Sequence, residues 1–292
     1  MLAILEQDRE AMHLLILGCG DIGTRVGLSI LQHGWRVSAV RRRPQLLPDD
    51  FDRIALDLTE AERFSELDQV SPDYVLVTPT PPSYDPAGYQ SGFAGVAQAL
   101  AGQEWVARCR RVFWVSSTRV YREAGGGWVD EHSALNVDEP QAAAMVAAEA
   151  SVRRGATATI IRPAGVYGNP EGMLMRRVRA GEGGGTDAPY GNRIHRDDLS
   201  RLIVHCLLRD LNGESVPPTL IGADHDTTPT HEIEDWLAGQ LGLTLKRPAE
   251  GGPVRANRRC ANGLLGQIGF ALDYPTWREG YQDALAFSAE DV

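Results

Sequence analysis

The feature that most constrains the fold is an alternation of short apolar runs with helical patterns between residues 13 and 165. The apolar runs have strand length and are rich in Val, Ile and Leu, which is typical of strands buried on both faces. They cover 13–18, 35–42, 54–58, 74–78, 111–117 and 157–163, and the helical patterns cover 21–34, 59–70, 94–109 and 139–154. Strands that alternate with helices form βαβ units. We therefore expect an α/β fold with a Rossmann-type, doubly wound parallel sheet.

The pattern changes after residue 165. Turn-rich segments follow, separated by helical patterns, and TLIG (219–222) has the character of a late strand that returns to the sheet. We expect residues 12–165 to form the Rossmann domain, with a return segment near 194–224. Residues 166–292 are expected to form a smaller C-terminal lobe that closes a cleft and binds substrate.

Charge and cysteine usage exclude several classes of function. The chain has 292 residues and a formal net charge of −10, and its longest basic block is Arg41–Arg43, so a nucleic-acid or anionic-membrane partner is disfavoured. The four cysteines have no metal-ligand spacing and suit a reduced compartment, and the N-terminal apolar run is too short to span a bilayer. We expect a cytoplasmic protein without a metal site. The strong preference for arginine over lysine, with Lys246 the single lysine, suggests a bacterial source.

A glycine motif marks the first turn of the expected sheet. GCGDIG, from Gly18 to Gly23, follows a strand and opens a helix. In such a loop Gly18 allows a tight turn, Gly20 lets the backbone approach a pyrophosphate, and Gly23 permits close helix packing. The helix N-terminus at Asp21 and Ile22 adds N–H donors and a positive dipole end. This context favours a dinucleotide site over a glycine-rich turn without ligand.

The end of the second strand discriminates between nicotinamide cofactors. A site for NAD(H) requires Asp or Glu there, whereas this chain offers Arg41, Arg42 and Arg43, whose guanidinium groups suit a 2′-phosphate. NADP(H) is therefore favoured, NAD(H) remains possible, and a solvated arginine turn is the plain alternative. Asp57, after the third strand, is placed to accept a hydrogen bond from an adenine amino group or to cap a helix.

The segment TPTPPSY (78–84) follows the fourth strand directly. Its prolines stiffen the backbone, and Thr78 and Thr80 offer hydroxyl groups. We expect either contact with cofactor or substrate, or a plain stiff connector.

Several motifs occur in an order that resembles a known superfamily. They are WVSSTRVY (114–121), VDE (129–131), RPAGVYG (162–168) and RIHRDDL (193–199). The chain resembles the extended short-chain dehydrogenase/reductases over roughly residues 13–280, and within them the NAD-dependent epimerase/dehydratase-like proteins. The resemblance implies a Rossmann fold and a nicotinamide cofactor.

The resemblance also implies which residues would be catalytic. Ser117 takes the place of the Ser/Thr that holds the substrate oxygen. The superfamily then carries a Tyr-x-x-x-Lys pair on the next helix, with a glutamate four residues after the lysine, so Glu149 fixes the register here. The tyrosine and lysine positions fall on Gln141 and Met145. The chain therefore resembles an atypical member that lacks this pair, on a helix that Asp138 is placed to cap.

Other side chains are candidates for moving a proton or contacting substrate. Tyr121 is either an acid or a packing residue at the cleft rim, and Tyr167 lies where the superfamily contacts substrate or nicotinamide. His195 titrates in a useful range but is usually structural at this position. Gln141 can bond a substrate carbonyl, and Arg193 belongs to the same substrate-contacting segment as His195.

Two functions remain open from the sequence. The first is an oxidoreductase or epimerase/dehydratase-like enzyme that acts on a hydroxyl or carbonyl group of a small molecule, with Ser117 orienting that oxygen and Tyr167, Tyr121 or water as the acid. The second is a catalytically silent NADP(H)-binding redox sensor or regulatory protein. The resemblance also suggests a possible homodimer.

Overall fold

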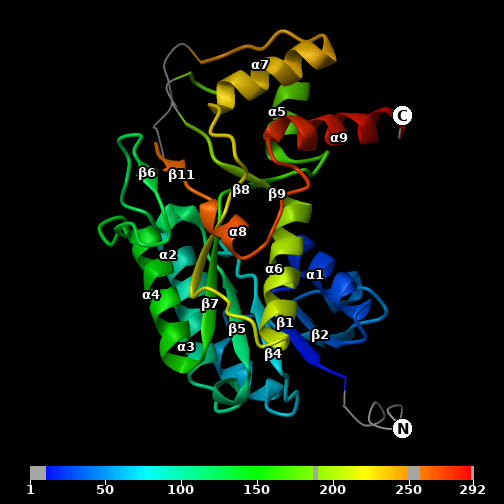
Figure 1. Cartoon of the computed structure of the whole chain (residues 1–292), viewed down its shortest axis with the longest axis vertical. Coiled ribbons are helices and arrows are strands. Elements are labelled where there is room, and N and C mark those ends of the chain that lie inside the picture. The colour runs from blue at the N-terminus through cyan, green and yellow to red at the C-terminus, as the bar shows by residue number, and fades with distance from the viewer. Residues whose placement is uncertain (1–10, 187–189, 249–256, 291–292) are drawn as a thin grey trace.

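Seven parallel strands form one sheet in the order β10-β7-β5-β4-β1-β2-β3 (Figure 1). The structure is a computed structural model and describes residues 11–186, 190–248 and 257–290. The strands are β1 His13–Leu17, β2 Arg36–Arg41, β3 Asp52–Ala55, β4 Tyr74–Val77, β5 Arg111–Val115, β7 Ala158–Pro163 and β10 Thr219–Gly222. The order reverses direction between β1 and β4, as in doubly wound sheets that bind ligands at this point. The predicted Rossmann-type fold is confirmed.

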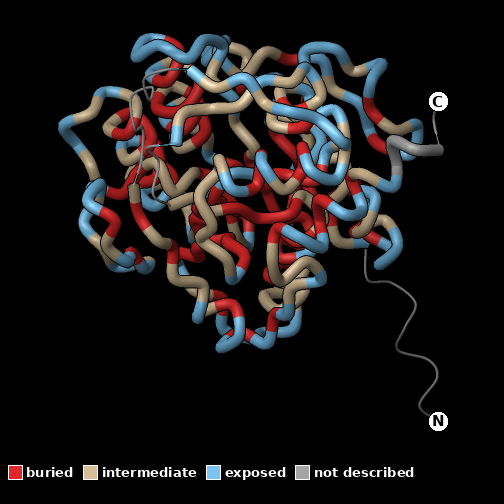
Figure 2. The backbone as a smooth tube through the Cα atoms, turned by 90° about the horizontal axis from the view of Figure 1, so that it is seen from above, coloured by how far each residue is buried: buried red, intermediate tan, exposed pale blue. Residues whose placement is uncertain are grey.

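Successive residues of β1 enter two different cores. Leu14 and Ile16 pack with helices α1 (Asp21–Leu31) and α6 (Arg196–Leu211) on one face of the sheet. Leu15 and Leu17 pack with α3 (Val96–Ala101) and α4 (Pro140–Gly155) on the other. Both faces are therefore buried, which explains why the strands are apolar without alternation. In Figure 2 the buried backbone runs through the middle of the molecule.

Two predicted helices differ from the structure. The pattern at 59–70 forms only a 3₁₀ helix, Ala61–Leu67, which buries Phe64 and Leu67 against the sheet. This segment connects β3 to β4 without forming an α-helix. The helix predicted at 94–109 begins earlier, at α2 (Pro86–Tyr89), where the Asp85 carboxylate caps it by accepting from the Gly88 N–H. A π-helical stretch joins α2 to α3, and α3 ends at Ala101.

The third strand also ends earlier than its apolar run. The run covers 54–58, but β3 pairs with β2 only over Asp52–Ala55. Leu56 is buried beyond the strand end, and Asp57 lies in the loop that follows.

A smaller group of elements lies over the carboxyl ends of the strands (Figure 1). Helices α5 (Met173–Arg179), α7 (Thr230–Leu241) and α9 (Trp277–Glu290) share a separate apolar core built around Val178, Leu237 and Trp277. The other elements are the pair β8 (Gly165–Tyr167) and β9 (Arg193–His195), the pair β6 (Trp128–Val129) and β11 (Arg259–Cys260), and helix α8 (Gly263–Gln267). Within this group Glu234, fully buried, is paired with Arg177 and Arg247.

Two kinds of feature are absent from the described residues, a helix suited to cross a membrane and a cluster of metal ligands. None of the helices in that part of the chain combines the length and the apolar character that a membrane crossing requires. The same residues contain no group of His, Cys, Asp and Glu side chains arranged to hold a metal ion.

Candidate functional site

The segments predicted to carry function meet at one edge of the sheet. Thr78 N–H donates to Leu17 O at 2.9 Å, which brings the end of β4 beside the glycine loop after β1. Ser116 N–H donates to Ile161 O at 2.7 Å, and Ala164 N–H donates to Gly222 O at 2.8 Å. The carboxyl ends of parallel strands thus form a continuous row, where ligands bind in such sheets.

The three glycines of the loop have different surroundings. Gly18 has φ +79°, and a Cβ there would lie 2.8 Å from the Thr78 carbonyl oxygen, so only glycine is accommodated. A Cβ on Gly23 would lie 2.9 Å from Ile16 Cγ2, which keeps α1 close to β1. A Cβ on Gly20 would meet nothing nearer than 3.9 Å, so the backbone there faces open space.

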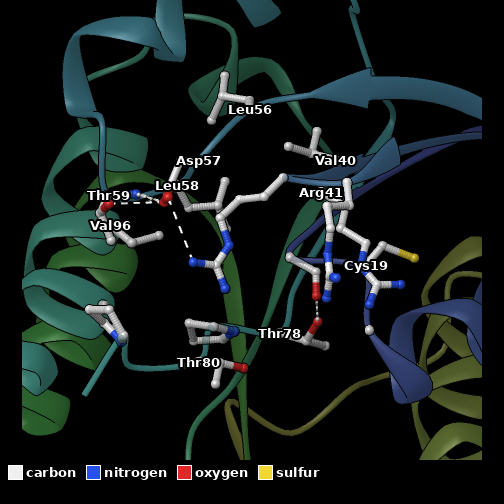
Figure 3. Close-up of a pocket in the computed structure, with 17 residues that line it drawn as sticks. Cys19, Val40, Arg41, Leu56, Asp57, Leu58, Thr59, Thr78, Thr80 and Val96 are labelled. Atoms are coloured by element: carbon white, nitrogen blue, oxygen red, sulfur yellow. Dashed lines mark hydrogen bonds and ion pairs between the residues drawn. The ribbon is translucent and has the colours of Figure 1, made fainter. Parts of the chain in front are cut away.

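The glycine loop lines a pocket of about 240 Å³, which we call the loop pocket (Figure 3). Its walls come from the ends of β1, β2, β3 and β4 and from the start of α3. The lining residues are Gly18, Cys19, Gly20, Val40, Arg41–Arg43, Leu56–Thr59, Thr78–Thr80, Pro82, Gly92 and Val96. Of the predicted cofactor residues, the pocket brings together Gly18, Gly20, Arg41, Arg42, Asp57 and Thr78, with Thr80 at its rim. Ile22 and Gly23 face the core between α1 and β1, away from it.

The arginines of the loop pocket are poorly compensated. Arg42 Nη1 lies 3.9 Å from Asp57 Oδ2, beyond hydrogen-bond distance, and its side chain is 72% exposed. Among the described residues, Arg41 and Arg43 form no ion pair. Asp57 Oδ1 accepts from the Thr59 N–H at 3.0 Å and from Thr59 Oγ1 at 2.9 Å (Figure 3). One Asp57 oxygen therefore stabilises its own turn, and the other faces Arg42.

Thr78 connects two strands rather than projecting freely. Its Oγ1 donates to the Gly18 carbonyl at 2.7 Å (Figure 3), and its backbone N–H donates to the Leu17 carbonyl. This hydroxyl therefore fixes the conformation of the glycine loop. Thr80 is exposed and has no comparable bond among the described residues.

Helix α4 is anchored through its N-terminus and its buried face. The N-cap is Glu139, whose carboxylate accepts from the Ala142 N–H at 2.8 Å, so the prediction that Asp138 caps the helix is wrong by one residue. Asp138 instead pairs with Arg122 at the surface. Gln141 is half-buried in the first turn, and Met145 is 2% exposed within the apolar core.

Glu149 lies at the centre of a buried polar cluster. Its carboxylate accepts from Ser116 Oγ at 2.6 Å and from Arg162 Nη2 at 2.7 Å and Nε at 3.1 Å. Arg162 Nη1 in turn donates to Tyr121 Oη at 3.1 Å. Tyr121 is fully buried, and burial raises its pKa to about 12. We call Ser116, Tyr121, Glu149 and Arg162 the α4 cluster.

Ser117, next to this cluster, caps a short turn. Its Oγ accepts from the Arg119 N–H at 3.1 Å at the start of the 3₁₀ helix Thr118–Val120. This bond uses an acceptor position of the oxygen and leaves the hydroxyl proton of Ser117 without a partner in the described part of the chain. Arg119 itself is paired with Glu139 and lies over the Tyr89 ring.

Tyr167 and His195 lie together near α9. Tyr167 Oη donates to the Thr276 carbonyl at 3.1 Å, and burial raises the pKa of this phenol. His195 Nδ1 accepts from the Asp197 N–H at 3.3 Å, so the imidazole caps α6. Burial lowers the pKa of His195. The centroid of its ring lies 3.7 Å from the centroid of the Tyr274 ring. The neutral imidazole is the form that this capping bond requires.

A second cavity of about 480 Å³ lies on the other side of the glycine loop, and we call it the lobe cavity. Asp21 of α1 lines it from the sheet side, and the β8, β9, α5 and α9 segments line it from the lobe. Tyr167 and Arg193 are among its walls, whereas His195 is not. The sequence reasoning missed Arg196, which also lines it; the signal was a second arginine within the RIHRDDL segment.

Comparison with known proteins gives similarity through structure alone. No family model and no curated protein matches the sequence. A structure provisionally described as an NAD-dependent epimerase/dehydratase from Methylobacillus flagellatus has 27% identity and a TM-score of 0.78, covering 96% of this chain and 100% of that chain. MoeE5 in complex with UDP-glucuronic acid and NAD has 19% identity and a TM-score of 0.78, covering 97% and 100%. Bordetella bronchiseptica WbmG in complex with NAD and UDP has 14% identity and a TM-score of 0.79, covering 99% and 97%. The chain is therefore similar in fold, over nearly its whole length, to NAD-dependent epimerase/dehydratase structures.

Proposed function

We propose that this chain binds NADP(H) along the carboxyl edge of its sheet and acts as an oxidoreductase or epimerase/dehydratase-like enzyme on a hydroxyl or carbonyl group of a small molecule. The observation that carries the proposal is the loop pocket, where an open glycine backbone faces arginines without close carboxylate partners. Two structural neighbours are complexes with NAD, which supports a nicotinamide dinucleotide as the cofactor.

The residues of the loop pocket suit such a cofactor. The open backbone at Gly20 and the N-terminus of α1 would receive the pyrophosphate. Arg41 and Arg42 would bind the 2′-phosphate, since their guanidinium groups make charge-assisted bonds to phosphate oxygens. The Asp57 oxygen that faces Arg42 would accept from the adenine amino group. The arginine set favours NADP(H) over NAD(H).

At the reacting end, this chain would supply orientation and a proton. When bound, the cofactor supplies or accepts the hydride at the substrate carbon. Ser117 would donate its free hydroxyl proton in a hydrogen bond to the substrate oxygen and so hold it in place. Tyr167 is the acid that the proposal favours, because it lines the lobe cavity, whereas Tyr121 is fully enclosed in the α4 cluster. In reduction, the carbonyl carbon gains the hydride and its oxygen gains the proton.

A second function, a silent NADP(H)-binding sensor or regulatory protein, is favoured by one set of observations. Tyr167 Oη is bonded to the Thr276 carbonyl, Tyr121 Oη to Arg162, and Met145 is packed in the core. Burial raises the pKa of both tyrosines, which opposes their use as bases near neutral pH. In this alternative the nicotinamide is bound but not used.

Fluorescence titration with NADPH and NADH tests the cofactor assignment. The double variant Arg41→Ala/Arg42→Ala is expected to weaken NADPH binding by roughly 10- to 100-fold and NADH binding much less, because only NADPH carries the 2′-phosphate. Arg176→Ala, an exposed arginine on α5, is the matched control. Equal weakening of both cofactors would remove the phosphate argument, and binding of neither cofactor to the native chain would exclude both functions.

A crystal structure of the NADPH complex separates enzyme from sensor. The enzyme requires Ser117 and a proton donor within hydrogen-bond reach of the space beside nicotinamide C4. If only apolar groups surround nicotinamide C4, the enzyme is excluded and the silent NADP(H)-binding protein is the function that remains.

A further inference from the structure

Two successive arginines at β11 have different partners. This strand pairs with β6 beside the carboxyl edge of the sheet (Figure 1). The Arg259 guanidinium lies over the Trp128 and Tyr190 rings. Arg258 points the other way, because successive side chains of an extended chain face opposite sides. It is 6% exposed, and its Nη1 donates to the Thr118 carbonyl.

The backbone that carries Arg258 is fixed by one side chain. Asn192 Oδ1 accepts from the Cys260 N–H at 2.8 Å, and Asn192 Nδ2 donates to the Arg258 carbonyl at 2.9 Å. The buried guanidinium therefore has little freedom to move. It stays at the Thr118 carbonyl, one residue beyond Ser117.

Arg258 has no carboxylate partner in the described part of the chain. It forms no ion pair there within 4.0 Å, and its Nε is buried without a hydrogen-bond partner. Glu123 is close enough to act on its charge, but Glu123 Oε1 accepts instead from the N–H groups of Gly125 and Gly127, at 2.6 and 3.2 Å. Burial lowers the pKa of Arg258, yet a guanidinium remains protonated at neutral pH. The side chain is therefore a buried positive charge that the described residues leave uncompensated.

Two other arginines near Ser117 have carboxylate partners. Arg119 is paired with Glu139, and Arg162, in the α4 cluster, is paired with Glu149. Each of these pairs is neutral as a whole. Among the described residues, the uncancelled positive charge at this turn therefore belongs to the third guanidinium, the one at the Thr118 carbonyl.

We propose that Arg258 is a positioning residue of the reacting end: it holds the turn that carries Ser117, and its charge stabilises the substrate oxygen when that oxygen becomes negative. The inference rests on the proposed function, since only an enzyme forms such an oxygen. In reduction, the substrate carbon gains the hydride, and the electron pair of the C=O bond moves onto the oxygen that Ser117 holds. That oxygen then takes up a proton. A positive charge already fixed inside the protein lowers the free energy of the anionic oxygen without any reorganisation at that moment.

A thiol in place of the Ser117 hydroxyl measures this charge without a substrate. In Ser117→Cys, the pKa of the new thiol is read from the pH dependence of its alkylation by iodoacetamide, because only the thiolate reacts. The four native cysteines are buried, and the native chain gives their background rate. We expect the pKa to lie clearly below the ordinary thiol value of about 8.5. A pKa at or above that ordinary value would overturn the inference, because the charge would then not act at this position.

Two substitutions of Arg258 separate its charge from its hydrogen bond. Combined with Ser117→Cys, Arg258→Gln keeps a donor for the Thr118 carbonyl and removes the charge. We expect the thiol pKa to rise by about one unit, which leaves roughly tenfold less thiolate at neutral pH. Arg258→Lys keeps the charge and should leave the thiol pKa close to that of Ser117→Cys alone. Equal thiol pKa values in the Gln and Lys variants would overturn the role of the charge.

A matched control and two checks accompany these variants. Arg122→Gln removes an exposed arginine of a surface ion pair and should change the thiol pKa little, because solvent screens its charge. Since Arg258 is buried, the fold of each variant is compared by circular dichroism. If Arg258→Gln does not fold, the thiol pKa values of Ser117→Cys alone and with Arg258→Lys decide, and an ordinary value in either overturns the inference. The proposed function fails separately, through absence of NADPH binding to the native chain, which does not depend on the thiol measurement.

Discussion

Around the loop pocket, Arg41 and Arg43 have no ion pair within the described residues, whereas beneath α4 Arg162 is bonded to a carboxylate and to a phenol. The same contrast holds for glycine and alanine. Gly20 leaves backbone open to solvent, while the alanines on the buried face of α4 fill space against the sheet. One region keeps its polar groups free for a ligand, and the other uses them internally. We therefore expect the proposed cofactor binding and the stability of the fold to depend on separate residues, and three sets of variants test that separation.

The largest effect is expected at Glu149. Glu149→Ala leaves Arg162, whose side chain is 5% exposed, as a buried charge without its carboxylate. We expect a loss of about 3–5 kcal/mol in the free energy of unfolding, measured by urea denaturation. The double variant Glu149→Leu/Arg162→Met should recover much of this loss. Asp138→Ala, in the exposed Arg122–Asp138 pair, should cost less than about 1 kcal/mol. Similar losses in both single variants would contradict a special role of the α4 cluster.

The second pair of changes lies within the glycine loop. Gly23→Ala places a methyl group 2.9 Å from Ile16 Cγ2, so we expect a stability loss of about 1–3 kcal/mol. Gly20→Ala places a methyl group no nearer than 3.9 Å from the Gly18 carbonyl oxygen, without a clash, and should change stability by less than about 0.5 kcal/mol. Its NADPH affinity should nevertheless fall about tenfold, because the methyl occupies the ligand side of the loop. If Gly20→Ala destabilised the fold as much as Gly23→Ala, the loop would not divide into a packing part and a binding part.

A smaller effect is expected at Tyr121. Tyr121→Phe removes one hydrogen bond from Arg162 and should cost about 1 kcal/mol of stability without changing NADPH affinity. If the chain proves to be an enzyme, turnover should be retained in Tyr121→Phe and lost in Tyr167→Phe. Loss of turnover in Tyr121→Phe with normal stability would assign the acid to the α4 cluster. That cluster would then serve the reaction rather than the stability of the fold.

A separate prediction concerns the slope of stability with pH rather than a loss at one pH. Asp224 has one buried oxygen without a partner, and burial raises its folded-state pKa from 3.8 to about 8. Between these values the folded chain holds a proton that the unfolded chain has released, so stability falls as pH rises and levels off above pH 8. Asp224→Asn keeps the oxygen that accepts from the Asp226 N–H and removes the titration. Its stability should fall less from pH 5 to pH 8 than that of the native chain; parallel curves from denaturation at several pH values would show that Asp224 does not titrate there.

Local pattern was enough to predict the sheet and the glycine loop. The strand runs and the Gly-x-Gly-x-x-Gly spacing are short-range signals with direct physical causes. The start of the α2–α3 helix was missed because it depends on Asp85 as a cap and on glycines packed against the 81–83 turn, where a Cβ on Gly88 would meet Ser83. The helix at 59–70 was overestimated because apolar periodicity does not separate a 3₁₀ turn from an α-helix.

The site was predicted less completely than the fold. The Glu149–Arg162 pair and the Arg193 contacts join residues whose neighbourhood only the tertiary structure defines. For the Glu149–Arg162 pair, the available signal was an arginine within an apolar strand run, since a buried guanidinium requires a carboxylate partner. The roles of Ser117, Tyr167 and Tyr121 in a reaction stay predictions.

The Tyr281 wall of the lobe cavity has a consequence for how the chain acquires its shape during synthesis. The last strand of the sheet, β10, ends at Gly222, whereas the cavity needs Tyr281 from α9. A ribosome therefore releases every strand of the sheet before it releases the residue that completes the cavity. The strands of the sheet are therefore all synthesised while the lobe cavity still lacks one wall, and the cavity is complete only once α9 has left the ribosome.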